Sequence, residues 1–333
     1  MSEKILDIKE ERLSFFTPAG EVKALNGVSF TMNQGDVLGV VGESGSGKSV
    51  TAYSVMGLTA YPGKLVGGKV WFNGHEIENM KEKDFRKIRG NEVSIIFQDP
   101  MTSLNPVYTI GNQIVEVIRL HTDKNKADAW ARAKELLELV GINEPEKRLK
   151  QYPHELSGGM RQRVMIAIAL ACEPKLLIAD EPTTALDVTI QAQILELMQE
   201  LRKKLGMSII MITHDLGVVA QMCEKIAVMY AGHIVEYGTT DEIFYQPGHE
   251  YTKGLINSIP KLNTEVRERL VPIEGTPVDL LNPPAGCPFA PRCKNCMKIC
   301  LSKMPPRTEL SDTHYTYCWL QQKAAFEKGE KAE

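Results

Sequence analysis

A glycine-rich stretch, GESGSGKS from Gly42 to Ser49, carries the clearest chemical signal in the chain. It follows the apolar run VLGVV and precedes VTAYSVMGL, which has helical composition. In this order the glycines let backbone N–H groups face a β-phosphate, Lys48 reaches the β- and γ-phosphate oxygens, and Ser49 offers its hydroxyl to Mg²⁺. A glycine-rich turn without a ligand is the alternative, and the flanking strand and helix argue against it. The predicted nucleotide contacts here are Gly42, Glu43, Ser44, Gly45, Ser46, Gly47, Lys48, Ser49 and Val50.

Two acidic residues, Asp180 and Glu181, end a second apolar run, LLIAD. Asp180 is predicted to hold Mg²⁺ through water, and Glu181 to orient and deprotonate a water that attacks the γ-phosphate. The alternative is that the two residues belong to a solvated acidic loop. The run LLIAD is expected beside the strand that leads into the glycine-rich loop (the P-loop), and this position disfavours the alternative. The pair therefore predicts hydrolysis of a nucleotide rather than its storage.

Polar residues also follow two further apolar runs, with Gln98 after VSIIF and His214 after SIIMIT. Ligands of open parallel sheets gather beyond the carboxyl ends of the strands, so both side chains can point into one site. Either residue alone is more often a structural hydrogen-bonding group. Together with the loop and the acidic pair they are predicted to sense the γ-phosphate, with Gln98 also a ligand of Mg²⁺. The predicted catalytic set is Lys48, Gln98, Glu181 and His214.

Continuous apolar runs that alternate with helical patterns indicate a mainly parallel α/β sheet. The runs are VLGVV, VSIIF, LLIAD, SIIMIT and IAVMY, and alternating apolar residues before them predict an antiparallel β layer. Helical spacing between residues 105 and 151 predicts a helical insert, with Gly141 placed to end a helix. After Gln246 prolines multiply and periodicity fades, which predicts an irregular extension with little core.

Composition narrows the class of protein. With 333 residues and 43% apolar content the chain can build a full core, and a formal charge of -3 provides no broad field for nucleic acid. No apolar run approaches the roughly 20 residues that span a bilayer, and acidic residues stand where a secretory signal has its apolar region. We therefore expect a cytosolic chain. In apolar surroundings, Cys172 and Cys223 are expected to be core thiols.

The segment LSGGMRQR, from Leu156 to Arg163, resembles the signature of ATP-binding cassette (ABC) ATPases. Physically, Ser157 can cap a helix whose first N–H groups then attract an anion. The resemblance implies a P-loop NTPase fold and a head-to-tail dimer that holds two ATP molecules. It assigns Ser157, Gly158, Gly159 and Gln162 to the signature, Gln98 to the Q-loop, Asp180 and Glu181 to the Walker B end, Asp187 to the D-loop and His214 to the switch. It also implies an aromatic residue stacked on adenine, for which we favour Phe15 over Phe16.

Further segments resemble the ATPase subunits of oligopeptide/dipeptide importers: FQDPMTSLNPVYTIGNQIVE, QPGHEYTKGLINSIP and GCPFAPRC. This resemblance implies an ABC domain over residues 1–245, with a helical subdomain at about 99–156, and an extension over residues 246–333. It implies two permease subunits, a homologous second ATPase and an extracytoplasmic peptide-binding protein, with this chain on the cytoplasmic face of the membrane. A nickel importer and an ABC ATPase acting on nucleic acid are the alternatives.

Five cysteines cluster near the end of the chain, at Cys287, Cys293, Cys296, Cys300 and Cys318. Four thiolates suit a tetrahedral Zn²⁺ site or a [4Fe–4S] cluster, and the spacing does not choose between these metals. The last four cysteines would make a plausible zinc site. Resemblance to dipeptide-type subunits instead implies an iron–sulfur cluster on Cys287, Cys293, Cys300 and Cys318. Metal binding would supply folding energy to a segment with little core.

Overall fold

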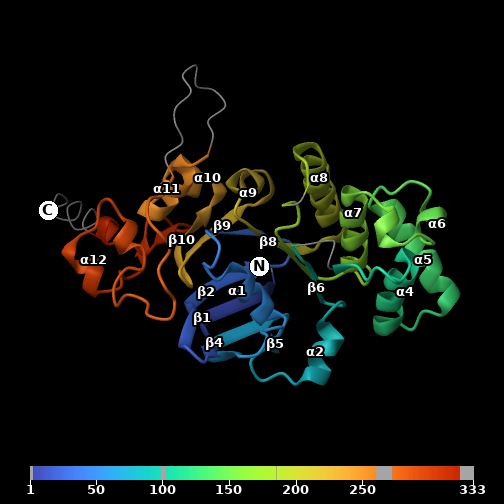
Figure 1. Ribbon diagram of the computed structural model, residues 1–333, viewed down its shortest axis with the longest axis horizontal. Coiled ribbons are helices and arrows are strands. Elements are labelled where there is room, and N and C mark those ends of the chain that lie inside the picture. Colours follow the sequence, from blue (N-terminus) through green and yellow to red (C-terminus); the bar gives the residue numbers. More distant parts are fainter. Residues whose placement is uncertain (1–2, 99–102, 185, 260–271, 323–333) are drawn as a thin grey trace, which may run out of the picture. The chain divides into compact units, whose positions relative to one another are not determined.

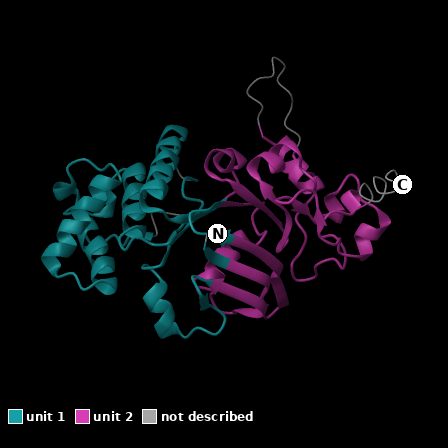
Figure 2. Ribbon diagram, turned by 180° about the vertical axis from the view of Figure 1, so that it is seen from behind, with its two compact units in different colours: residues 1–6, 32–37, 72–212 teal, residues 7–31, 38–71, 213–333 magenta. Residues whose placement is uncertain are grey.

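The computed structural model describes residues 3–98, 103–184, 186–259 and 272–322. The chain divides into two compact units, each built from several segments (Figure 2). Unit 1 contains residues 1–6, 32–37 and 72–212, and unit 2 contains residues 7–31, 38–71 and 213–333. Unit 2 thus groups the predicted extension with strands of the ATPase domain, and the predicted domain boundary at residue 245 stays a prediction.

The N-terminal strands form the antiparallel layer that the sequence predicts. The strands are β1 (Lys4–Thr17), β2 (Gly20–Asn33), β4 (Gly63–Phe72) and the short β5 (His75–Glu76). A connection of only two residues joins β1 to β2, and such a short link permits only antiparallel pairing. Leu13, Leu25 and Val28 are buried and supply the inner face.

A second sheet in unit 2 extends into the C-terminal region. Strand β3 (Val37–Val41) is buried at all five positions and runs parallel to β9 (Lys225–Tyr230). Strand β10 (His233–Thr239) is antiparallel to β9, β12 (Tyr315–Thr316) is antiparallel to β10, and β11 (Thr308–Glu309) pairs with β12. Because Tyr251, Phe289 and Tyr315 are buried as well, the prediction of an extension with little core is wrong. The core forms because residues distant in sequence pack there, which local periodicity does not record.

Unit 1 contains three parallel strands whose carboxyl ends carry predicted site residues. They are β6 (Val93–Ile96), β7 (Leu176–Asp180) and β8 (Ser208–Thr213), with β7 between the other two. Strands β7 and β8 are buried along their whole length, as expected for a sheet covered on both faces. Asp180 ends β7, and Gln98 lies two residues beyond β6.

The helices of unit 1 confirm the predicted helical insert, and Figure 1 shows α4 to α7 grouped together. Gly141 follows α5 with φ 72°, a left-handed conformation that ends the helix as predicted. Trp130 packs so closely on Gly111 that a Cβ there would lie 2.3 Å from the indole. The helices are α2 (Glu82–Ile88), α4 (Ile110–His121), α5 (Lys126–Leu139), α6 (Pro145–Arg148), the 3₁₀ turn η1 (Pro153–Glu155), α7 (Gly158–Ala169) and α8 (Val188–Leu205).

In the described part of unit 2 the helices are α1 (Lys48–Val55), α9 (Leu216–Met222), α10 (Thr240–Tyr245), α11 (Glu250–Asn257), the 3₁₀ turn η2 (Ala290–Arg292) and α12 (Lys298–Ser302). Cys223, just after α9, is a buried core thiol as predicted, whereas Cys172 is only half-buried. Cys172 lies beyond the end of α7, where its thiol interacts electrostatically with Arg132 and Glu173. The prediction that Cys172 is a core thiol is therefore wrong. Within the described ranges, every helix is too short or too polar to cross a bilayer.

Candidate functional site

The glycine-rich loop joins β3 to α1 in unit 2, as the sequence predicts. Gly42 has φ 152°, and a Cβ added there would lie 2.2 Å from the backbone oxygen of Met229. Gly47 has φ 103° and caps α1, and an added Cβ would lie 2.9 Å from the backbone oxygen of Ala24. Both positions therefore require glycine, because any side chain would collide with neighbouring backbone.

Lys48 folds back over the loop that precedes it. Its Nζ donates hydrogen bonds to the backbone oxygens of Gly42 (2.7 Å) and Glu43 (2.9 Å). The hydroxyl of Ser46 is buried and has no hydrogen-bond partner among the described residues. A buried polar oxygen without a partner is unusual, and a bound phosphate would give this hydroxyl an acceptor. Ser49 and Val50, also predicted contacts, lie half-buried in the first turn of α1.

In unit 1 the predicted catalytic carboxylate and the Q-loop glutamine meet. Oε2 of Glu181 accepts hydrogen bonds from Nε2 of Gln98 and from Oγ1 of Thr184, each at 2.9 Å. Glu181 adopts φ 47°, a left-handed conformation that is costly for a non-glycine residue and is typical of functional sites. The sequence reading missed Thr184, although its place three residues after Glu181 in a turn was a usable signal. Asp180, one residue earlier, is buried.

The predicted signature begins α7. Ser157 caps this helix, with Oγ accepting the N–H of Met160 at 3.3 Å, as predicted. Gly158, the first residue of α7, is half-buried, and an added Cβ would meet only the side chain of Leu186, at 3.9 Å. Gln162 is only 1% exposed, and its Nε2 has no partner among the described residues. Its predicted role at the nucleotide therefore stays a prediction.

The other predicted contacts occupy strand and helix ends. Asp187 caps α8 by accepting the N–H of Ile190 at 3.0 Å, a structural role that the sequence reading missed. His214 directly follows β8 and is exposed. Phe15 is half-buried in β1 beside Gly63, whereas its neighbour Phe16 is 46% exposed with Nζ of Lys64 above its ring. The choice between the two aromatic rings for adenine stays a prediction.

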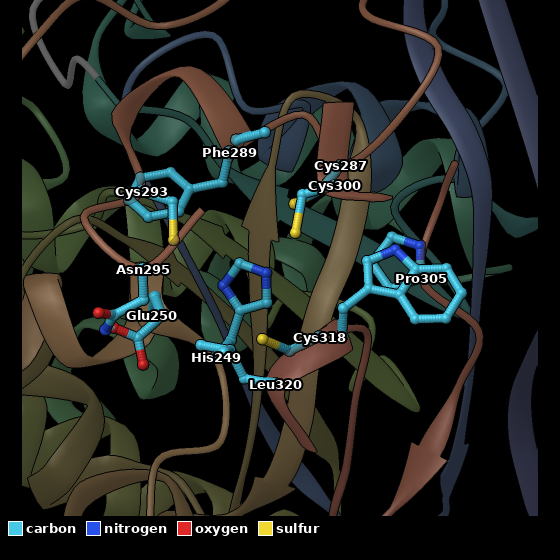
Figure 3. A pocket seen from close by; sticks show the side chains of 12 residues that line it. His249, Glu250, Cys287, Phe289, Cys293, Asn295, Cys300, Pro305, Cys318 and Leu320 are labelled. Carbon is cyan, nitrogen blue, oxygen red and sulfur yellow. The ribbon is translucent and has the colours of Figure 1, made fainter. Parts of the chain in front are cut away.

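Four cysteines of the C-terminal cluster line one pocket in unit 2 (Figure 3). They are Cys287, Cys293, Cys300 and Cys318, the set that the resemblance implies, while Cys296 is exposed and lies outside the lining. Burial raises the pKa of Cys287 to about 12 and that of Cys293 to about 11. No group of three or more His, Cys, Asp or Glu side chains in the described part of the chain is arranged to hold a metal ion.

His249 also lines this pocket, and the sequence reading missed it. Figure 3 shows its imidazole among the cysteine side chains. Its Nδ1 accepts the backbone N–H of Tyr251 at 3.1 Å, and burial lowers the pKa of His249 to about 4. The imidazole is therefore neutral at physiological pH. Its position as the cap of α11 gave no sequence signal, because the cysteines that surround it lie about 40 or more residues away in the chain.

Three features define an ABC-type ATPase. They are a P-loop that leads into a helix, a parallel strand with two acidic residues at its end, and a capped helix at the LSGG segment, all within mixed α/β units. The ABC transporter family profile matches residues 25–184, and the profile of the oligopeptide/dipeptide transporter C-terminal region matches residues 235–300. The chain belongs to the ATP-binding proteins of the ABC transporter family, of the oligopeptide/dipeptide type. As the predicted site chemistry requires, it is an ATPase.

Several curated relatives resemble the chain along nearly its whole length. The oligopeptide transport ATP-binding protein OppD of Bacillus subtilis is 56% identical over 95% of this chain and 89% of the relative. The dipeptide transport ATP-binding protein DppD of the same organism is 53% identical, over 97% and 96%, and OppD of Escherichia coli is 52% identical, over 96% and 94%. A solved dimeric ATP-binding cassette bound to ADP and Pi superimposes with a TM-score of 0.64 at 26% identity, covering 71% of this chain and 98% of that one.

Proposed function

We propose that this protein is the ATP-hydrolysing motor subunit of an ABC importer for di- and oligopeptides. The observation that carries the proposal is its 52–56% identity to curated peptide-transport ATP-binding proteins over at least 95% of the chain. The similarity includes the C-terminal region, which matches the oligopeptide/dipeptide transporter profile. Neither a nickel importer nor an ATPase acting on nucleic acid is favoured by these relatives.

The residues of the site suit hydrolysis of ATP. The P-loop amides and Lys48 bind the phosphates, while Ser49, Asp180 and Gln98 would hold Mg²⁺, which neutralises charge on the phosphate oxygens when bound. Glu181 accepts the proton of the attacking water. The hydrogen bonds from Gln98 and Thr184 fix the orientation of this carboxylate.

A second cassette completes the site in this proposal. The amides at the start of α7 lack intrahelical acceptors, and the helix dipole makes that end attractive to an anion. We expect these amides, Gly158 among them, to face a γ-phosphate bound by the P-loop of the opposite subunit. Ser157 holds the loop in place, and His214 and Asp187 are expected beside the same phosphate. We propose that the partner is a homologous second ATPase.

Transport requires a membrane partner. We propose that the segment from Gln98 into the helical insert docks on two permease subunits at the cytoplasmic face of the membrane, with an extracytoplasmic peptide-binding protein delivering cargo. Closure of the ATP-bound dimer would turn the permease outward, and hydrolysis at Glu181 would reset it. The chain would thus associate with the membrane peripherally.

We further propose that the cysteine pocket holds a [4Fe–4S] cluster, with zinc as the alternative. The support is the donor chemistry alone, because four thiols line one pocket and Cys296 stays outside it. Anaerobic purification should yield stoichiometric iron and acid-labile sulfide, and Cys300→Ser should lose both while Cys296→Ser retains them. Stoichiometric zinc without iron in the anaerobic sample would overturn the cluster.

Purification from the native host tests the transport proposal. Permease subunits, a second ATPase and a peptide-binding protein should co-purify, and the reconstituted complex should take up di- or oligopeptides only when ATP is supplied. Uptake of Ni²⁺ but not peptide would overturn the proposed cargo. ATPase activity stimulated by nucleic acid, without co-purifying permeases, would overturn the transport function itself.

A further inference from the structure

An ion pair joins the C-terminal region to the phosphate-binding loop. Nη1 and Nη2 of Arg292 bind Oε2 and Oε1 of Glu43 at 2.5 and 3.0 Å, a two-point contact between guanidinium and carboxylate. The Arg292 side chain is 4% exposed and that of Glu43 is 30% exposed. Bidentate, largely desolvated pairs of this type are stronger and geometrically more specific than surface ion pairs.

A second contact holds the backbone of the same loop residue. The hydroxyl of Tyr251, which is fully buried in α11, accepts the backbone N–H of Glu43 at 2.8 Å. The backbone oxygen of Glu43 accepts a hydrogen bond from Lys48, the phosphate-binding lysine. The C-terminal region thus fixes both the side chain and the main chain of a residue that also contacts Lys48.

Packing of aromatic rings connects the contacts with Glu43 to the cysteine pocket. Arg292 directly precedes Cys293, and its guanidinium lies 5.8 Å from the ring centre of Tyr230 and 6.0 Å from that of Phe289. Phe289 packs edge-on against Tyr230 at 5.3 Å between ring centres, and it lines the cysteine pocket. The guanidinium is also anchored by the backbone oxygens of Glu274 and Ile273, at 3.0 and 3.2 Å.

We propose that Arg292 and Tyr251 are positioning residues for the P-loop, through which the C-terminal region sets the affinity for ATP. An acidic residue inside a phosphate-binding loop repels a triphosphate unless its charge is compensated. Arg292 compensates Glu43 and holds its carboxylate on the side of the C-terminal region. Tyr251 keeps the first turn of the loop in the conformation that presents its amides. The inference rests on ATP binding at the P-loop, and it is independent of the transported cargo and of the metal.

Four variants of the full chain test the proposal by equilibrium binding of a fluorescent ATP analogue with Mg²⁺. Arg292→Gln should weaken ATP binding by about tenfold, because it uncovers Glu43 and removes charge-assisted hydrogen bonds. Tyr251→Phe, which keeps the ring, should weaken it by about threefold to tenfold. Glu43→Gln combined with Arg292→Gln should restore most of the affinity, since no uncompensated charge remains. Arg307→Gln is the matched control, because Arg307 pairs with Glu309 at 2.7 Å and stacks on Tyr315 in the same region.

The steady-state readout separates positioning from general damage to the fold. Arg292→Gln should raise KM for ATP while kcat at saturating ATP stays within about twofold, because the uniform loss of binding leaves the chemical step intact. A purely structural role would lower Tm and the fraction of active protein but leave the affinity of the folded molecules unchanged. Unchanged affinity in both Arg292→Gln and Tyr251→Phe, or no recovery in the double variant, would overturn the proposal. Peptide uptake and iron content are measured in separate assays. Failure of the transport proposal or of the cluster proposal is therefore distinguishable from failure of the proposal for Arg292 and Tyr251.

Discussion

Replacement of Glu181 by glutamine offers the sharpest test of the catalytic assignment. The carboxylate accepts two hydrogen bonds at 2.9 Å, from Gln98 and Thr184, and the glutamine carbonyl can still accept from these donors. The left-handed backbone at φ 47° costs the same for both side chains. The fold and ATP affinity should therefore change little, whereas the proton acceptor for the attacking water is lost.

The expected loss of turnover follows from the role of a general base. Such groups contribute about 10²–10⁴-fold, which corresponds to about 3–5 kcal/mol of transition-state stabilisation. Phosphate release at saturating ATP measures the rate, and fluorescence titration measures binding. Because hydrolysis no longer opens the assembly, ATP should also trap a closed dimer that size-exclusion chromatography detects.

A matched control exists in the same unit. Glu173 also has a left-handed backbone, with φ 54°, and pairs with Arg132 at 2.8 Å. Glu173→Gln makes the same chemical change outside the predicted motifs, so its turnover should match the parent. If Glu181→Gln retained more than about a tenth of parental turnover, or if Glu173→Gln lost as much, Glu181 would not be the catalytic base.

Three further predictions concern the glycine-rich loop, the signature helix α7 and the start of α10. Gly42→Ala should abolish ATP binding in the titration assay, because its Cβ would lie 2.2 Å from the backbone oxygen of Met229. Ser157→Ala should cost about 1 kcal/mol in denaturant unfolding through loss of the α7 cap, whereas Ser157→Thr should restore the cap and most of the stability. Burial acts to raise the pKa of Glu242, but hydrogen bonds from Ser311, Thr239 and Thr313 lower it to about 2 from an ordinary value of 4.5. The ionised carboxylate therefore stabilises the fold above about pH 4.5, and this stabilisation is lost as the pH falls toward 2. The difference in Tm between the parent and Glu242→Gln should narrow over that range. A difference in Tm that does not change with pH would contradict this linkage.

Local sequence patterns determined the elements that depend on near neighbours. The glycine loop predicted the β3–α1 turn, the buried runs predicted the strands, Ser157 predicted the α7 cap, and Gly141 predicted the end of α5. Each depends on backbone sterics, capping or hydrophobic periodicity within a few residues, and these act on the chain wherever it folds.

Tertiary structure decided the contacts that no local pattern encodes. Arg292 reaches Glu43 across a separation of 249 residues, and His249 enters a pocket built by cysteines downstream. Spacing alone left open which four of the five clustered cysteines share a site, and packing placed Cys296 outside. The C-terminal region gains its core by adding β12 to β10 and burying aromatic residues that show no periodicity. The sequence by itself therefore determined the ATPase and its phosphate loop, whereas long-range packing alone decided that the cysteine region holds that loop in place.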